Sequence, residues 1–118
     1  MGQIMKKTCL MILIVSLISC STVDRSETMK VNGLICLKDT KKPYSGTVVE
    51  YYESTYQKSE IRYRRGVLHG VSTTWHETGL KKEEGNWNHG IKDGIWKSWA
   101  LNGALILTVR YRDGVPDH

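Results

Sequence analysis

The sequence predicts an all-β fold: an elongated single-layer antiparallel β-meander of three 24-residue hairpin repeats plus one N-terminal strand. Aromatic residues recur every twelve positions, and glycines recur every 24 positions in two series. Between them lie half-units of about seven residues with the β-branched and alternating polar character of strands. A fixed period of this kind indicates a repeat architecture. The aromatic ladder is Tyr51, Tyr63, Trp75, Trp87, Trp99 and Tyr111; the glycine series are Gly46, Gly70, Gly94 and Gly66, Gly90, Gly114.

Residues 1–19 are predicted to be a secretory signal peptide. Lys6 and Lys7 form a short positive region. The apolar run that follows, over residues 10–18, is too short for a stable membrane span and leads directly into polar sequence. The last residues of the run, Leu17-Ile18-Ser19-Cys20, resemble the lipobox of bacterial lipoproteins. That resemblance implies cleavage before Cys20 and acylation of Cys20. The alternative is an ordinary cleaved signal with a chance cysteine.

A lipid on Cys20 would place the protein in the bacterial cell envelope, because several acyl chains together anchor a protein stably. The next residue is Ser21 rather than Asp, which by resemblance to enterobacterial sorting favours the outer membrane. Residues 20–33 are expected to be the lipidated cysteine and a flexible tether, since the stretch is polar and has no periodicity. Residues 34–118 are expected to form the repeat domain.

Charge and cysteine content limit the function classes. Removal of Lys6 and Lys7 from the 17 basic residues leaves 15 against 12 acidic residues, a formal charge of +3. This mild excess does not suggest a nucleic-acid partner. After loss of the signal and lipidation of Cys20, only Cys36 remains, so no internal disulfide is expected. Cys36 lies in an apolar run and is interpreted as a small buried hydrophobic residue.

Short strands joined by tight turns are expected throughout the repeat domain. The first strand is expected over residues 34–37, before a turn-forming stretch that ends at Pro43. The turns inside the repeats are Ser54-Thr55, Thr78-Gly79 and Asn102-Gly103. Thr55 replaces the glycine found in the other two turns, so the first hairpin should be the most strained or differently looped.

The loop length decides which residues share a face of the sheet. A three-residue loop with Gly79 in the left-handed conformation would pair odd with odd positions. It would place the whole aromatic ladder on one apolar side, where Gly85 leaves space for a neighbouring ring. A two-residue loop would instead put Trp75 and Trp87 on opposite sides.

The other side would carry basic residues from neighbouring strands. They are a possible binding surface for an acidic protein, an anionic lipid headgroup or an envelope polysaccharide. Local pairing with Glu50, Glu60 and Glu84 is the alternative. The basic residues are Lys58, Arg62, Arg64, Lys82, Arg110 and Arg112.

The aromatic side poses a packing problem, since one layer of strands has no second layer to cover it. Either the rings pack on one another along a twisted sheet, or a second copy or a partner covers them. No catalytic residues, cofactor or metal site is expected. The histidines lack ligand spacing, and a sheet of hairpins rarely offers a concave active site.

Residues 70–82 and 84–94, GVSTTWHETGLKK and EGNWNHGIKDG, resemble the bacterial MORN-repeat variant. The resemblance covers about residues 43–117, with Thr55 and Ile61 departing from the pattern in the first repeat. It implies an open sheet of hairpins, a binding or scaffolding role and no catalysis. Its motif residues define the fold: the ladder and glycine series above, together with Gly79, Gly85 and Gly103.

The leading hypothesis is therefore an envelope lipoprotein whose repeat sheet is a non-catalytic protein-interaction or scaffold module. It would bind the membrane through Cys20 and bind a protein partner or itself. Many bacterial relatives are labelled antitoxins of the YwqK type. The alternative is accordingly an antitoxin or immunity protein that neutralises a cognate toxin.

Overall fold

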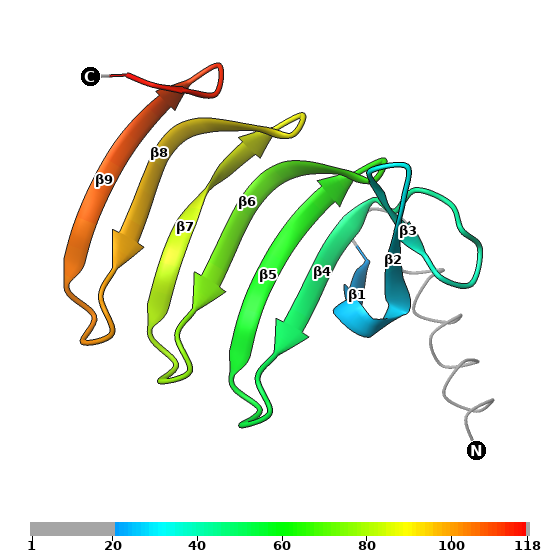
Figure 1. Cartoon of the computed structure of the whole chain (residues 1–118), viewed down its shortest axis with the longest axis horizontal. Coiled ribbons are helices and arrows are strands. Elements are labelled where there is room, and N and C mark those ends of the chain that lie inside the picture. The colour runs from blue at the N-terminus through cyan, green and yellow to red at the C-terminus, as the bar shows by residue number, and fades with distance from the viewer. Residues whose placement is uncertain (1–20, 118) are drawn as a thin grey trace.

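The computed structural model describes residues 21–117, which form an elongated body of 51 × 32 × 28 Å. Its main feature is an eight-stranded sheet with the strand order β1-β4-β5-β6-β7-β8-β9-β10 (Figure 1). From β4 to β10 the sheet is an antiparallel meander in which each strand pairs with the next one along the chain. The predicted all-β meander is confirmed.

The meander strands coincide with the half-units of the repeat. Each carries the β-branched and aromatic residues that favour extended backbone. Their bounds are β4 Gly46–Tyr51, β5 Gln57–Arg64, β6 Val67–Trp75, β7 Lys81–Asn88, β8 Ile91–Trp99, β9 Leu105–Arg112 and β10 Val115–Pro116.

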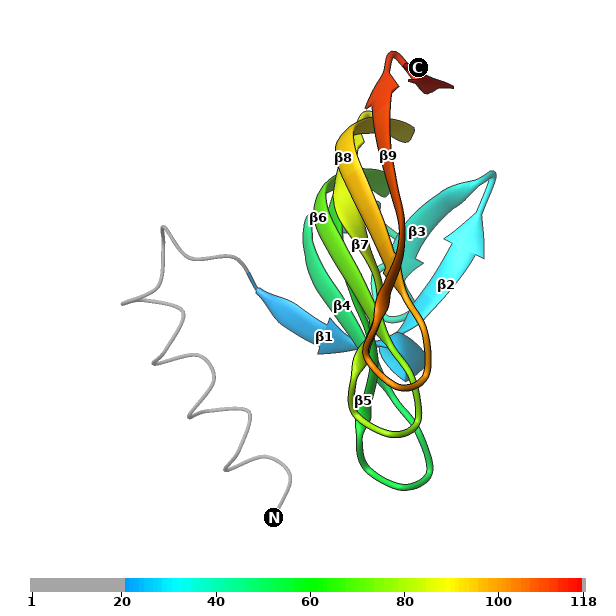
Figure 2. The same cartoon turned by 90° about the vertical axis from the view of Figure 1, so that its left-hand side faces the viewer.

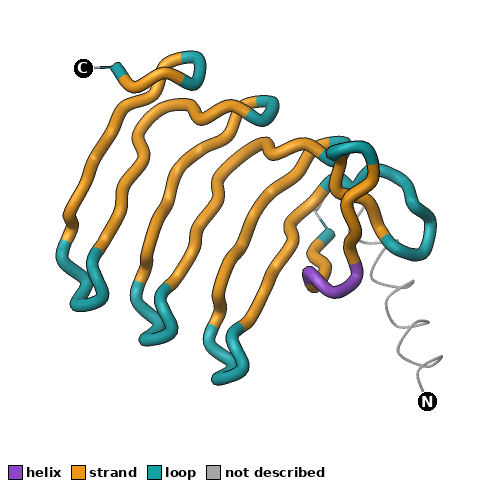
Figure 3. The backbone as a smooth tube through the Cα atoms, viewed as in Figure 1, coloured by secondary structure: helices purple, strands orange, loops and turns teal. Residues whose placement is uncertain are grey.

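At one end of the meander the strands are joined by two-residue turns, drawn as loops in Figure 3. Both residues of each turn have positive φ, as a type I′ turn requires. The pairs are Arg65-Gly66 (51° and 80°), His89-Gly90 (50° and 83°) and Asp113-Gly114 (51° and 81°). Glycine at the second position explains why one glycine series repeats every 24 residues.

At the other end the hairpins are longer. In the second repeat the His76 N–H donates to the Leu80 carbonyl and the Gly79 N–H donates to the His76 carbonyl, so Glu77–Gly79 form the loop tip. Gly79 has φ 92°, and the predicted three-residue loop with a left-handed glycine is confirmed. Thr55 occupies the same position with φ 75°, which strains a β-branched residue as expected.

A register shift next to each of these loops overturns the predicted sharing of faces. Trp75 pairs with Lys81, but Thr74 already pairs with Glu83, so one residue of β7 is bulged out. The bulge changes odd–odd pairing into odd–even pairing for the rest of the hairpin. Trp75 and Trp87 therefore lie on opposite faces, and the prediction of one aromatic side was wrong.

We name the two faces by a row of residues that crosses the sheet at mid-strand. The core face carries Val48, Ile61, Ser72, Gly85, Trp96 and Val109. The opposite face carries Thr47, Arg62, Val71, Asn86, Ile95 and Arg110. Strand alternation puts Tyr63, Trp87 and Tyr111 on the core face and Tyr51, Trp75 and Trp99 on the opposite face.

Side-chain volumes along the core-face row compensate for one another. Trp96 is only 5% exposed, and its ring occupies the space where a Cβ on Gly85 would be. In the first repeat Ile61 stands at the position of Gly85 and Ser72 at the position of Trp96, so the larger residue has moved to the neighbouring strand. The space expected beside Gly85 is confirmed, and the ring that fills it is Trp96.

The N-terminal segment is ordered into elements, contrary to the expected flexible tether. β1 (Thr22–Asp24) pairs in parallel with β4, and a short 3₁₀ helix, η1 (Arg25–Glu27), follows it. β2 (Thr28–Val31) and β3 (Leu34–Leu37) then form a separate two-stranded sheet, so residues 34–37 are not the first strand of the meander. Backbone hydrogen bonds hold β1 against β4, which polar composition alone did not reveal.

The β2–β3 hairpin stands over the core face at the β4–β5 end of the sheet (Figure 2). The Ile35 N–H donates to the Gly66 carbonyl, and the Gly66 N–H donates to the Tyr44 carbonyl. Ile35, Tyr44 and Val48 form the buried cluster beneath it, with Val23, Leu37 and Tyr63 packed around them. This end of the core face thus has a second layer that the sequence analysis did not foresee.

Candidate interaction surfaces

The largest concentration of exposed apolar side chains lies on β9. Leu105, Ile106 and Leu107 are 53%, 64% and 54% exposed, and Leu101 in the preceding loop is 66% exposed. Leu107 pairs with Ser98 on the side toward β8. A run of four exposed aliphatic side chains in and beside one strand exceeds the scattered apolar residues that are normal on protein surfaces.

β9 also presents an unpaired backbone edge. β10 pairs only with Tyr111 and Arg112, and the Asp117 N–H donates to the Arg110 carbonyl. Within residues 21–117, no strand pairs with the outer edge of β9 from Leu105 to Thr108. An apolar strand with a free edge is a template for pairing with another chain.

Next to β9, aromatic rings on the core face cover one another. Trp96 makes edge-on contacts with Trp87 and Tyr111, at centroid distances of 5.0 and 6.4 Å. Its indole Nε1 donates to the Asn86 carbonyl at 3.1 Å. The Lys92 ammonium lies 4.4 Å from the Trp96 centroid and 5.1 Å from the Tyr111 centroid. These rings pack within the sheet, which was one of the two options the sequence left open.

The six predicted basic residues do not share one side of the sheet. Lys58 pairs with Glu50 at 3.6 Å and lies 5.6 Å from the Tyr52 centroid, on the core face. Lys82 is the bulged residue of β7, so it falls outside the alternation of that strand, and it lines a core-face hollow with Glu83. Arg62 and Arg110 belong to the row that defines the opposite face. Arg64 and Arg112 lie two residues further along β5 and β9 and therefore share that face.

The bulges also determine the electrostatics of the opposite face. Lys81, rather than Lys82, donates to the Glu84 carboxylate at 2.9 Å, and the Thr73 hydroxyl donates to the same carboxylate. The Lys81 hydrogen bond is the main cause that lowers the pKa of Glu84 below its usual value, with Thr73 and the charge of Lys97 adding to the effect. Glu84, one of the predicted local partners, is thus paired with Lys81, a residue outside the predicted basic set.

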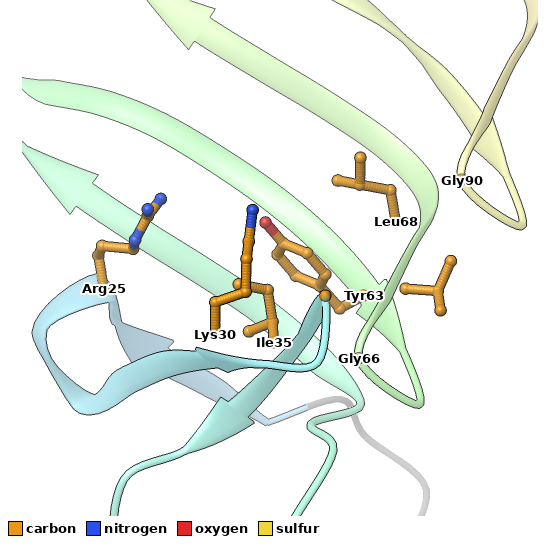
Figure 4. A pocket seen from close by; sticks show the side chains of 9 residues that line it. Arg25, Lys30, Ile35, Tyr63, Gly66, Leu68 and Gly90 are labelled. Atoms are coloured by element: carbon orange, nitrogen blue, oxygen red, sulfur yellow. The ribbon is translucent and has the colours of Figure 1, made fainter.

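A cavity of about 330 Å³ lies between the β2–β3 hairpin and the main sheet (Figure 4). Its apolar wall includes Ile35 and Leu68, and Arg25 and Lys30 stand at its rim near Tyr63. Burial raises the pKa of the Tyr63 hydroxyl, and the positive charge of Arg25 partly offsets this. The sequence did not predict this cavity, because two of its lining residues, Arg25 and Lys30, were expected to lie in a flexible tether.

The thiol and imidazole groups occupy structural positions. Cys36 is 2% exposed, which agrees with its interpretation as a buried hydrophobic residue. His76 bonds to the Trp99 carbonyl at 2.9 Å. The His69 and His89 rings meet edge-on at 4.7 Å. Among residues 21–117 no group of three or more histidine, cysteine or carboxylate side chains is arranged to hold a metal ion.

Sequence reasoning missed several residues of these surfaces and of the packing beneath them. Trp96 and Lys92 fall outside the twelve-residue ladder, and Ile106 is a bulge position whose face no periodicity predicts. The glycine at position 85 was the one signal available for Trp96, since a glycine inside a strand often marks the close approach of a neighbouring group. The predicted signal peptide and the lipidation site Cys20 lie outside the described residues. Within these residues, none of the helical structure has the length and apolarity to traverse a bilayer.

Comparison of the chain with protein-family models, curated proteins and solved structures gives no match.

Proposed function

We propose that the chain is a lipid-anchored protein of the bacterial cell envelope whose MORN-type repeat sheet acts as a non-catalytic protein-interaction module. The observation that carries the proposal is the exposed apolar edge strand β9. The lipobox-like sequence at Cys20 supports the anchor, and the 24-residue hairpin repeat supports the MORN-type relationship.

The partner that this surface suits is an extended apolar segment of a second protein, added to the sheet as a further strand. Main-chain groups along the free edge of β9 supply hydrogen bonds to the added strand. Leu105, Ile106 and Leu107 supply the apolar contacts. At the other end of the sheet β1 already pairs with β4 and the β2–β3 hairpin covers the core face, so that end is less suited to strand addition.

The test places a photo-crosslinking residue at position 106 in the lipid-modified chain, with position 71 as the matched control. Ile106 and Val71 are comparably exposed aliphatic residues, at 64% and 50%, but Val71 lies in mid-sheet on the opposite face. A crosslinked protein is expected from position 106 alone. Ile106→Lys in the same cells should abolish co-purification of that protein, whereas Val71→Lys should leave it intact. Equal crosslinking from both positions would contradict a docking role for β9.

The identity of the captured protein separates the remaining possibilities. A crosslink to a second copy of this chain identifies self-association. Capture of a growth-inhibiting protein whose toxicity this chain suppresses identifies the antitoxin alternative. Light scattering on the chain from Ser21, with and without Ile106→Lys, distinguishes a dimer from a monomer independently of any other protein.

A further inference from the structure

A second hollow, of about 430 Å³, lies at the opposite end of the sheet from β9. Arg62, Arg64, His69 and Ser45 line it, together with Tyr63 and the backbone of Gly46 and Gly70. The side-chain stem of Arg62 lies against Gly70, where a side chain would crowd it. No carboxylate is among the lining residues, so the hollow concentrates positive charge.

Comparison of equivalent repeat positions shows how this charge arises. In the third repeat Arg112 forms an ion pair of 2.9 Å with Asp117. The residues 48 positions earlier, two repeats back, are Arg64 and His69. The first repeat therefore keeps the arginine and replaces the carboxylate with an imidazole. An external anion would restore the charge balance that Asp117 provides in the third repeat.

The polar groups around the hollow are arranged as hydrogen-bond donors. The His89 N–H donates to His69 Nδ1 at 3.2 Å, so neutral His69 carries its proton on Nε2 and can donate from there. The Arg65 N–H donates to Ser45 Oγ at 2.8 Å, which leaves the hydroxyl proton of Ser45 to donate elsewhere. Guanidinium groups supply planar, charged donors that match the oxygens of phosphate.

We propose that this hollow binds a phosphate-type oxyanion, held by the Arg64 guanidinium with His69 and Ser45 as further donors. A tetrahedral oxyanion accepts several hydrogen bonds at once, and every side chain named here can donate one. Carboxylates and neutral sugars fit the set less well, because they have fewer acceptor oxygens or no charge.

The position of Ser21 favours a membrane lipid as the source of the phosphate. This choice of source rests on the proposed anchor at Cys20. The Thr47 N–H donates to the Ser21 carbonyl at 2.9 Å, and Thr47 follows Gly46 of the hollow. Cys20 directly precedes Ser21 in the sequence. A lipid on Cys20 would thus hold this corner of the sheet at the headgroup layer.

The test is an NMR titration of the ¹⁵N-labelled chain from Ser21, which contains every described element, with inorganic phosphate. Sodium chloride at equal ionic strength is the reference. Saturable shifts are expected at the amides of Gly46 and Gly70. Arg64→Gln should weaken binding about tenfold or more, because it removes a charged donor. His69→Asp should do the same, since it restores the carboxylate of the third repeat beside Arg64.

Arg112→Gln is the matched control, because it changes the equivalent arginine of the third repeat and should leave phosphate binding unaltered. The proposal is overturned if chloride gives the same shifts, or if Arg112→Gln loses as much affinity as Arg64→Gln. Amide spectra of the variants report whether each one is folded.

Vesicles identify the source of the anion. Binding to vesicles of phosphatidylglycerol and phosphatidylcholine, but not to phosphatidylcholine alone, with loss in Arg64→Gln, assigns the site to anionic lipid headgroups. Phosphate binding without vesicle binding assigns it to a soluble phosphate compound. Because the chain from Ser21 carries no lipid, neither result depends on the anchor at Cys20 or on partner binding by β9.

Discussion

At the scale of single residues, the fold depends on a few positions where backbone conformation or volume leaves little choice. Gly79 and Gly103 adopt φ of 92° and 90° in their hairpin loops, and Thr55 adopts φ 75° at the same position of the first loop. For an L-residue with a Cβ the left-handed region costs about 1–2 kcal/mol. The first hairpin therefore carries strain that the other two avoid.

Thr55→Gly should stabilise the protein by about 1 kcal/mol, because glycine adopts the left-handed conformation without a Cβ clash. The measurement is urea unfolding of the chain from Ser21. Gly79→Thr, the reciprocal change one repeat later, should destabilise by a similar amount. If both substitutions lower stability, the strain is not located at this loop position.

Gly85→Ala should destabilise the fold by about 3 kcal/mol, at the upper end of the usual range for overpacking, because its Cβ would overlap the rigid Trp96 ring. Unfolding measurements on a double-mutant cycle check the cause. In a Trp96→Ala background the penalty for Gly85→Ala should nearly vanish. An unchanged penalty there would assign the cost to the backbone of position 85.

The lowered pKa of Glu84 gives a pH prediction. Its carboxylate is stabilised in the folded state, so this contribution is present above the unfolded pKa and is lost as pH falls through the folded pKa, below the usual value of 4.5. Glu84→Gln should therefore reduce the loss of stability between pH 7 and pH 3. Thermal unfolding of both proteins at each pH measures this loss. The change should stay below about 1 kcal/mol because the pair is partly exposed. A larger acid sensitivity in Glu84→Gln would contradict the assignment.

At the scale of elements, the short strand β1 joins the N-terminal segment to the sheet. Val23 of β1 lies beside Val48 of β4 and packs against the Ile35–Tyr44–Val48 cluster. η1 follows with a capping box in which Asp24 accepts from the Ser26 N–H and the Glu27 carboxylate accepts from the Asp24 N–H. The β4 edge of the meander is covered in this way, whereas the β9 edge is not.

Val23→Ser should cost about 1–2 kcal/mol, since it removes apolar area from the core beneath the β2–β3 hairpin. Chemical denaturation of the chain from Ser21 measures the loss, and Thr22→Ser on the exposed side of β1 serves as the control. A flexible tether would tolerate both changes equally. No difference between the two variants would therefore favour the tether over the strand.

At the scale of the whole molecule, the sheet is a quasi-one-dimensional repeat whose strands contact mainly their neighbours. The β2–β3 hairpin covers the core face at one end of the sheet. The exposed strand β9 lies at the other end, where its outer edge is largely unpaired. With β1 bound to β4, a lipid on Cys20 would fix the β4 end near the membrane and leave β9 at the far end of the sheet (Figure 1). Anchor and proposed docking strand would then be separated by the length of the meander.

Cys20→Ser in the full chain should release the protein from the membrane fraction, because no acyl chains can then be attached at that position. Fractionation of cells that express the two forms measures this, with Cys36→Ser as the control for loss of a thiol elsewhere. Persistent membrane association of Cys20→Ser after a high-salt wash, which screens any binding of lipid headgroups by the basic hollow, would contradict the lipobox interpretation.

The sequence by itself determined the repeat, the number of hairpins within it and the left-handed glycine of the second loop, because these depend on local backbone preferences and on spacing along the chain. Gly79, predicted to be left-handed, adopts φ 92°, a conformation that glycine takes without a Cβ clash. The face of each side chain depended instead on a bulge of one residue beside each loop, such as the shift between Thr74 and Trp75. A period of two inverts at every such insertion, and composition does not indicate where it occurs.

Only the tertiary structure decided how the ends of the sheet are covered. Residues 21–33 are polar enough to suggest a tether, yet their backbone groups pair with β4 and β3. The meeting of Arg64 with His69, the cover of Trp96 over Gly85 and the exposure of β9 likewise follow from register between strands. Such contacts join distant parts of the chain, and their free energy comes from packing that no local pattern records.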